Sequence, residues 1–158
     1  LYNVPGRTSS NMTAQTTLRL AKDFENIVAV KEASGSLDQC TSILKDRPEG
    51  FLVISGDDTL SLPIIASGGD GVISVVANAL PMEYSELVSA SLEGDLKTAQ
   101  KRQYQLFDLI NALFEEGNPA GVKAALKILG VCDEHVRLPL VPASSALTNK
   151  ISGLLKGM

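Results

Sequence analysis

The chain has 158 residues, of which 44% are hydrophobic and 20% are charged; this length allows a sizeable core, and this composition is typical of a globular protein. The formal net charge of −4, with no basic stripe and no aromatic-rich RNA motif, argues weakly against nucleic-acid binding. The apolar runs are far shorter than a membrane span, so we expect a cytoplasmic protein without a membrane partner.

The first half of the chain alternates between apolar strands and amphipathic helices. It opens at Leu1, without a methionine, on residues that are typical of the end of a strand entering a loop, so we expect an upstream portion. A helix is predicted over Thr13–Asp23, and the run IVAVKE from Ile27 predicts a strand. The continuous apolarity of this run indicates burial on both faces, as in a parallel sheet.

The same alternation continues to about residue 80. Ser36 and Gln39 have the spacing of a capping box, which predicts the start of a second helix. FLVIS, which ends at Ser55, and GVISVV, residues 71–76, predict two further strands with a short helix over residues 60–66 between them. Strands and helices in such alternation are typical of βα units around a parallel sheet.

From Pro81 onward the sequence predicts helices only. Helical stretches at residues 81–94, 95–116 and 119–130 are followed by an extended connector with Pro139 and Pro142, and then by a last amphipathic helix. We therefore divide the chain into βα units at 1–80 and a helical region at 81–158.

Lys31 stands at the end of the first buried strand. In a barrel of parallel strands, residues at the carboxyl ends of the strands face the mouth of the active site. Partial desolvation lowers the pKa of a lysine there and frees its lone pair, so that the amine condenses with a ketone to an imine. The protonated imine then withdraws electrons from the adjacent carbon. The alternative is a structural lysine paired with a carboxylate such as Glu32.

The opening loop YNVPGRT holds a phenol, Tyr2, and a guanidinium, Arg7, around a Pro-Gly turn. A tyrosine can relay protons during imine formation, and an arginine can bind a substrate carboxylate through two parallel hydrogen bonds. The alternative is an exposed turn with a packed tyrosine, which the loop by itself favours.

The turn after the second strand contains Gly56, Asp57 and Asp58. The glycine permits close approach of the backbone to a ligand. Two adjacent acidic residues could suggest magnesium, but their side chains point in different directions and no third ligand is evident. Asp58 as the cap of the following helix is the better prediction.

No metal site is predicted. Cys40, Cys132 and His135 lack the spacing of metal ligands. Both cysteines are expected to be reduced, and each is interpreted as a small core residue rather than a reactive one.

Five segments in the order YNVPGRT, VAVKEASG, SGDD, GGDGVISVVAN and EGNPAGVKAAL resemble the dihydrodipicolinate synthase family, within the larger group that includes N-acetylneuraminate lyase. The resemblance spans nearly the whole chain but only the second half of a typical member. It implies the C-terminal half of a (β/α)8 TIM barrel, with the end of strand 5 and strands 6 to 8 in residues 1–80. Residues 81–158 would then hold the last barrel helix and a C-terminal helical extension.

The resemblance also implies an activity and a site. The activity is an aldol-type condensation of pyruvate with L-aspartate 4-semialdehyde to 4-hydroxy-tetrahydrodipicolinate, in lysine and diaminopimelate biosynthesis, with no metal or organic cofactor. Lys31 would be the Schiff-base lysine and Tyr2 the proton relay. Arg7 would bind the carboxylate of the semialdehyde. The residues expected to line the pyruvate pocket are Gly56, Ile73 and, less directly, Asp57.

Two other functions stay open. One is an N-acetylneuraminate lyase-like or other pyruvate-dependent aldolase; Arg7 favours the synthase, because sialic acid lyases do not generally carry an arginine in this loop. The other is a non-catalytic half-barrel association module. The first half of family members carries further relay and subunit-contact residues, so we expect this chain alone to be weak or inactive as an enzyme. We also expect a homo-oligomer, because half a barrel leaves sheet edges open.

Overall fold

The computed structural model describes residues 1–158, which form two compact units. Unit 1 comprises Leu1–Ser74 and Val88–Leu96, and unit 2 comprises Val75–Leu87 and Lys97–Met158. We describe each unit by itself, and the division at residue 80 stays a prediction. None of the helices has the length and apolarity needed to cross a membrane.

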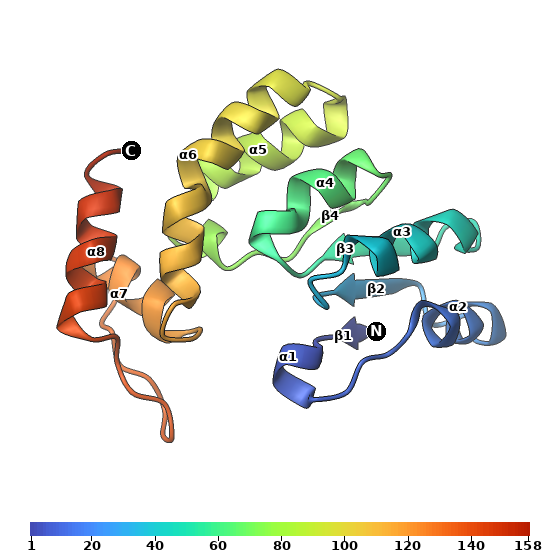
Figure 1. Cartoon of the computed structure of the whole chain (residues 1–158), viewed down its shortest axis with the longest axis horizontal. Helices are drawn as coiled ribbons and strands as arrows, with labels where there is room; N and C mark the ends of the chain where they lie inside the picture. Colours follow the sequence, from blue (N-terminus) through green and yellow to red (C-terminus); the bar gives the residue numbers. More distant parts are fainter. The chain divides into compact units, whose positions relative to one another are not determined.

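Unit 1 contains a sheet of four parallel strands in the order β1-β2-β3-β4 (Figure 1). The strands are β1 (Tyr2–Asn3), β2 (Ala29–Glu32), β3 (Leu52–Ser55) and β4 (Gly71–Val72). Strands that are adjacent in the sheet are also consecutive in the chain. Because they are parallel, each connection must cross over and bring the chain back to the end of the sheet where the next strand begins. The α/β fold with a parallel sheet is therefore confirmed.

Helices connect these strands. They are α1 (Pro5–Thr8), α2 (Ala14–Asp23), α3 (Leu37–Asp46), the 3-10 turn η1 (Asp58–Leu60) and α4 (Ser61–Ala66). The hydroxyl of Thr13 accepts a hydrogen bond from the N–H of Thr16, and that of Ser36 accepts one from the N–H of Gln39, so α2 and α3 each begin directly after a capping residue, as was predicted for Ser36. Helix α3 and strands β2 and β3 enclose a buried core of Val30, Ile43, Phe51 and Val53.

Two predicted features within residues 1–80 are wrong in detail. The strand predicted over residues 71–76 ends at Val72, and Val76 begins a second 3-10 turn, η2 (Val76–Asn78). An apolar run of this length is compatible with a strand or with a buried helical turn, and Val75 adopts helical φ/ψ angles. The opening loop likewise contains a helical turn, α1, because Pro5 suits the first position of a helix.

Unit 2 is helical, as predicted. Helix α5 (Pro81–Glu93) begins in it, and α6 (Leu96–Phe114), α7 (Ala120–Ile128) and α8 (Ser145–Leu155) complete it. Helix α7 comes close to the end of α6, since a Cβ on Gly121 would lie 2.3 Å from the carbonyl oxygen of Leu113. Only a glycine permits that contact, which explains the small residues at the start of α7.

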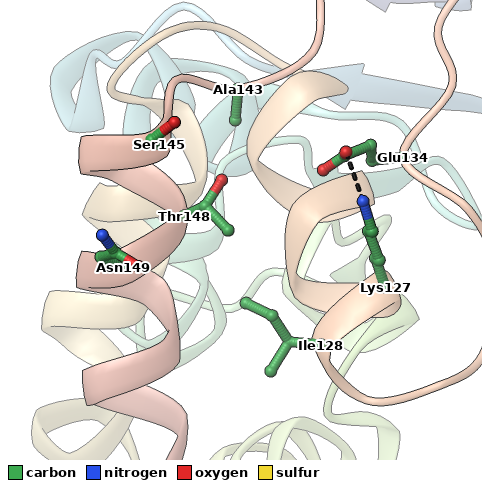
Figure 2. Close-up of a pocket in the computed structure, with 7 residues that line it drawn as sticks. All are labelled: Lys127, Ile128, Glu134, Ala143, Ser145, Thr148 and Asn149. Atoms are coloured by element: carbon green, nitrogen blue, oxygen red, sulfur yellow. Dashed lines mark hydrogen bonds and ion pairs between the residues drawn. The ribbon is translucent and has the colours of Figure 1, made fainter.

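A hollow of about 490 Å³ lies within unit 2, between α7, α8 and the connector that joins them (Figure 2). The Nζ of Lys127 forms an ion pair with Glu134 at 2.5 Å on its wall. The hydrogen bond to Glu134 raises the pKa of Lys127, so this amine stays protonated and is a poor nucleophile. None of the predicted site residues lines this hollow.

Candidate active site

Tyr2 and Lys31 lie side by side at the carboxyl ends of β1 and β2. They are direct partners in the parallel ladder, and the N–H of Lys31 donates to the carbonyl oxygen of Leu1 at 2.9 Å. The Nζ of Lys31 stands 4.2 Å from the centroid of the Tyr2 ring, within cation–π range. Tyr2 is 51% exposed and the lysine is half-buried. An amine and a phenol therefore share one open face of the sheet.

Glu32 does not serve as the partner of Lys31. Side chains alternate along a strand, so Glu32 points to the opposite face of β2 from Lys31. Its carboxylate accepts hydrogen bonds from Asn3, from the N–H of Ser34 and from Gln39. The interpretation of Lys31 as one half of an ion pair with Glu32 is thus wrong.

Gly56 brings the loop after β3 against the side chain of Lys31. Its N–H donates to the carbonyl oxygen of Glu32 at 2.8 Å, which continues the ladder beyond the end of β3. A Cβ at this position would lie 3.0 Å from Cε and 3.1 Å from Cγ of Lys31, and 2.7 Å from Cβ of Ala33. The absence of a side chain at Gly56 therefore lets this loop pack against the lysine, and its predicted approach to a ligand stays a prediction.

Asp57, rather than Asp58, caps the following turn. The Oδ1 of Asp57 accepts hydrogen bonds from the N–H of Thr59 at 3.1 Å and from its hydroxyl at 2.9 Å. Asp58 is 2% exposed and is the first residue of η1. The prediction of Asp58 as the cap was off by one residue because the helix starts with a 3-10 turn, and Asp57 has the extended backbone that a capping residue adopts.

Ile73 and Arg7 complete the predicted set at the same edge of the sheet. The N–H of Ile73 donates to the carbonyl oxygen of Ser55 at 2.9 Å, which places Ile73 beside the start of the loop that carries Gly56, and Ile73 is 55% exposed. Arg7 is exposed on α1, directly after β1. Tyr2 and Lys31 thus lie within adjacent strands of unit 1, and the other four predicted residues follow the carboxyl ends of β1, β3 and β4.

The sequence interpretation missed a buried polar network behind the site. Asn3 and Glu32 are 2% and 1% exposed, and together with Asn11 and Gln39 they form what we call the Glu32 cluster. The sequence did contain a signal for this network. Side chains alternate along a strand, so if Lys31 lies on one face, Glu32 must lie on the other, where α2 and α3 pack. The residues directly before Lys31 are all apolar, so the alternation was not visible in the sequence.

Neither cysteine takes part in this geometry. Cys40 is 2% exposed, and burial, followed by the nearby charge of Glu32, raises the pKa of its thiol to about 11. It is the small core residue that was predicted. Cys132 is exposed, so the same prediction for Cys132 is wrong. It follows the end of α7, outside any helix or strand.

Comparisons with known proteins agree along the whole chain. The model of the Dihydrodipicolinate synthetase family matches residues 1–158. A 4-hydroxy-tetrahydrodipicolinate synthase of Phocaeicola vulgatus is 50% identical over 155 residues, which are 98% of this chain and 52% of that protein. The chain thus spans about half the length of the curated relatives it matches.

Solved structures agree equally well. The dihydrodipicolinate synthase of Thermotoga maritima superposes with a TM-score of 0.96 at 40% identity, over 99% of this chain and 54% of that one. A synthase variant described as monomeric superposes with a TM-score of 0.93 at 39% identity, over 98% and 53% of the two chains.

Proposed function

The chain belongs to the dihydrodipicolinate synthetase family, and from this premise we propose that it carries the Schiff-base half of a pyruvate-dependent aldol-type lyase. The observation that carries the proposal is the amine of Lys31, 4.2 Å from the ring of Tyr2 at the open end of a parallel sheet. The proposed reaction condenses pyruvate with L-aspartate 4-semialdehyde to 4-hydroxy-tetrahydrodipicolinate, a step of lysine and diaminopimelate biosynthesis.

The proposed architecture is the C-terminal half of a (β/α)8 barrel. The strands β1 to β4 would be the end of strand 5 and strands 6 to 8, and residues 81–158 would be the last barrel helix and a helical extension. Four consecutive parallel strands and the match to about half of each relative support this. β1 and β4 are the outer strands of this sheet, and each has one edge without a neighbouring strand. We therefore also propose that these edges pair with a second copy of the chain or with another polypeptide segment.

The chemistry starts at Lys31. Its neutral amine attacks the ketone carbon of pyruvate, and loss of water from the adduct gives a protonated imine. This imine takes up the electron pair released when the methyl group loses a proton, which gives an enamine. The enamine carbon attacks the aldehyde carbon of the second substrate. Attack of the product amine on the imine carbon then closes a ring and releases Lys31.

The other residues serve this sequence of steps. The hydroxyl of Tyr2 relays protons to and from the adducts, which fits its place beside the amine. Arg7 binds the carboxylate of the semialdehyde. Gly56 and Ile73 bound the pyruvate pocket, and Asp57 holds the turn that carries Gly56. No step requires a metal or an organic cofactor, because the protonated imine is the electron sink.

Borohydride trapping tests the proposal. The protein is incubated with pyruvate and sodium borohydride, and its mass is measured before and after digestion. We expect the mass of one reduced pyruvyl group on the peptide that contains Lys31, and none in a Lys31→Arg variant. Lys45→Arg, an exposed lysine of the same unit, is the matched control and should trap like the parent chain. Failure of the parent chain to trap pyruvate would favour a non-catalytic association module.

A second candidate is an N-acetylneuraminate lyase-like or other pyruvate-dependent aldolase. It shares the lysine chemistry, so trapping does not separate it from the synthase. Arg7 favours the synthase, because a carboxylate on the aldehyde requires a cation near the strand ends. A comparison of aspartate 4-semialdehyde with neutral aldehydes, in the parent chain and in Arg7→Ala, distinguishes the two.

A further inference from the structure

The Glu32 cluster lies directly behind the proposed catalytic pair. Tyr2 pairs with Lys31 in the ladder, and the next residues, Asn3 and Glu32, pair with each other. Because side chains alternate, the second pair occupies the opposite face of the same two strands. The exposure differs accordingly, since Tyr2 is 51% exposed and Glu32 is 1% exposed.

The buried carboxylate of Glu32 is held by neutral donors. Its Oε1 accepts hydrogen bonds from the N–H of Ser34 at 2.8 Å and from the Nδ2 of Asn3 at 3.0 Å. Its Oε2 accepts from the Nε2 of Gln39 at 2.9 Å and from the same Nδ2 at 3.0 Å. A buried charge is tolerated only when its hydrogen-bonding capacity is filled in this way. A network so complete fixes the position of each member.

Through the cluster, Glu32 holds the segment that returns from Arg7. The Nδ2 of Asn3 donates to the Oδ1 of Asn11 at 2.9 Å, and the Oδ1 of Asn3 accepts from the N–H of Met12 at 2.9 Å. Gln39 completes the attachment, since its Oε1 accepts from Asn11 at 2.9 Å and its Nε2 donates to the carbonyl oxygen of Met12 at 3.2 Å.

Both ends of the turn that carries Arg7 are therefore fixed to the strand that carries Lys31. One end is β1, which forms the ladder with β2, and the other is Asn11 and Met12 in the cluster. The turn between them has no buried residue of its own. These two attachments fix both ends of the turn relative to Lys31.

We propose that Glu32 is a positioning residue for the second substrate. By organising Asn3, Asn11 and Gln39 it fixes where Arg7 stands relative to the amine of Lys31, and so it sets the affinity for the carboxylate of the aldehyde. Imine formation with pyruvate does not depend on it, because Lys31 is held by the ladder and by the Gly56 loop. The inference rests on the proposed function.

Glu32→Gln tests the proposal with almost no change of volume. The amide replaces one acceptor oxygen by an N–H donor, which must face the N–H of Ser34 or the Nε2 of Gln39. Rotation of the Gln39 amide would relieve the second conflict only by breaking its bond to the carbonyl oxygen of Met12. The conflict therefore loosens the attachment of Asn11 and Met12.

The expected result is a separation of the two substrates. In Glu32→Gln the KM for aspartate 4-semialdehyde rises about tenfold or more, while the rate of pyruvate trapping at Lys31 stays within about threefold of the parent chain. Amide hydrogen exchange over residues 8–12 accelerates about tenfold or more, with the strands of unit 1 unchanged. The exchange measurement tests the same proposal even if the chain shows no measurable turnover.

Two further variants keep the test decisive. Asn11→Ala removes the hydrogen bonds of Asn11 to Asn3 and Gln39 at an exposed position, so it tests the proposal even if Glu32→Gln folds poorly. It should raise the KM for the aldehyde and the exchange at residues 8–12 by smaller factors than Glu32→Gln does. Glu25→Gln, at an exposed glutamate of the same unit, should change nothing. An unchanged KM and unchanged exchange at 8–12, or a parallel loss of trapping, would overturn the proposal. If the parent chain traps no pyruvate, the proposed function fails, but exchange still tests the attachment.

Discussion

Gly56→Ala should damage the chemistry of Lys31 more than it damages the fold. The added Cβ would lie 2.7 Å from Cβ of Ala33, 3.0 Å from Cε of Lys31 and 3.1 Å from Cγ of Lys31, whereas carbon atoms in contact prefer about 3.5–4.0 Å. The backbone around residue 56 must therefore shift by several tenths of an ångström, and the lysine must turn away. Overpacking of this kind costs about 1–3 kcal/mol of stability.

The effect on imine formation should be larger. Displacement of a reacting group by about 1 Å can lower a rate by about a hundredfold, so we expect pyruvate trapping in Gly56→Ala to fall by about that factor. Trapping rates with borohydride and urea unfolding measure the two effects. Gly153→Ala is the control, because a Cβ there meets nothing within 4 Å.

A second substitution separates the two contacts of the new methyl group. Gly56→Ala combined with Ala33→Gly removes the 2.7 Å contact but keeps the contacts with Lys31. We expect the double variant to regain most of the stability and little of the trapping. Recovery of both would mean that the backbone shift alone disturbed the lysine, and normal trapping in Gly56→Ala would refute the argument altogether.

Two further predictions concern groups outside the site. Burial raises the pKa of Cys40 to about 11, so its thiolate fraction at pH 8 is about one in a thousand. Because Cys40 is also buried whereas Cys132 is exposed, iodoacetamide should modify Cys132 at least about a hundredfold faster than Cys40, and equal rates by peptide mass analysis would contradict the burial. Asp70→Asn weakens an ion pair with Arg47 and a 2.7 Å hydrogen bond from a backbone N–H of β3, so urea unfolding should show a loss of about 1–3 kcal/mol, with Asp46→Asn as a neutral control at an exposed pair.

Local signals in the sequence account for most of the fold. The apolar run before Lys31 and the run ending at Ser55 became β2 and β3, but only one face of each strand is fully buried, so the predicted burial on both faces was wrong. The helix after β2 begins directly after Ser36, whose hydroxyl accepts a hydrogen bond from the N–H three positions on, as the spacing predicts. Such features depend on neighbours in the chain and are visible without tertiary context.

The features that were missed depend on partners far along the chain. Gln39 has the spacing of a capping box, yet its side chain turns to Glu32 and Asn11 instead of back to the N–H of Ser36. The apolar run at residues 71–76 leaves the sheet after Val72. Both outcomes are decided by contacts between elements, which local spacing does not encode.

The ladder between β1 and β2 explains why the positions of Lys31 and Glu32 are set together. A slip of one residue in register would turn Lys31 toward the core and Glu32 toward the open face. An unpaired charge buried in this way costs several kcal/mol, and the carboxylate would lose the donors that Asn3, Ser34 and Gln39 provide. The satisfied glutamate on one face therefore specifies the register that presents the lysine on the other. In these two short strands, the residues that hold the fold and the residues proposed for catalysis are consecutive, so one ladder places both.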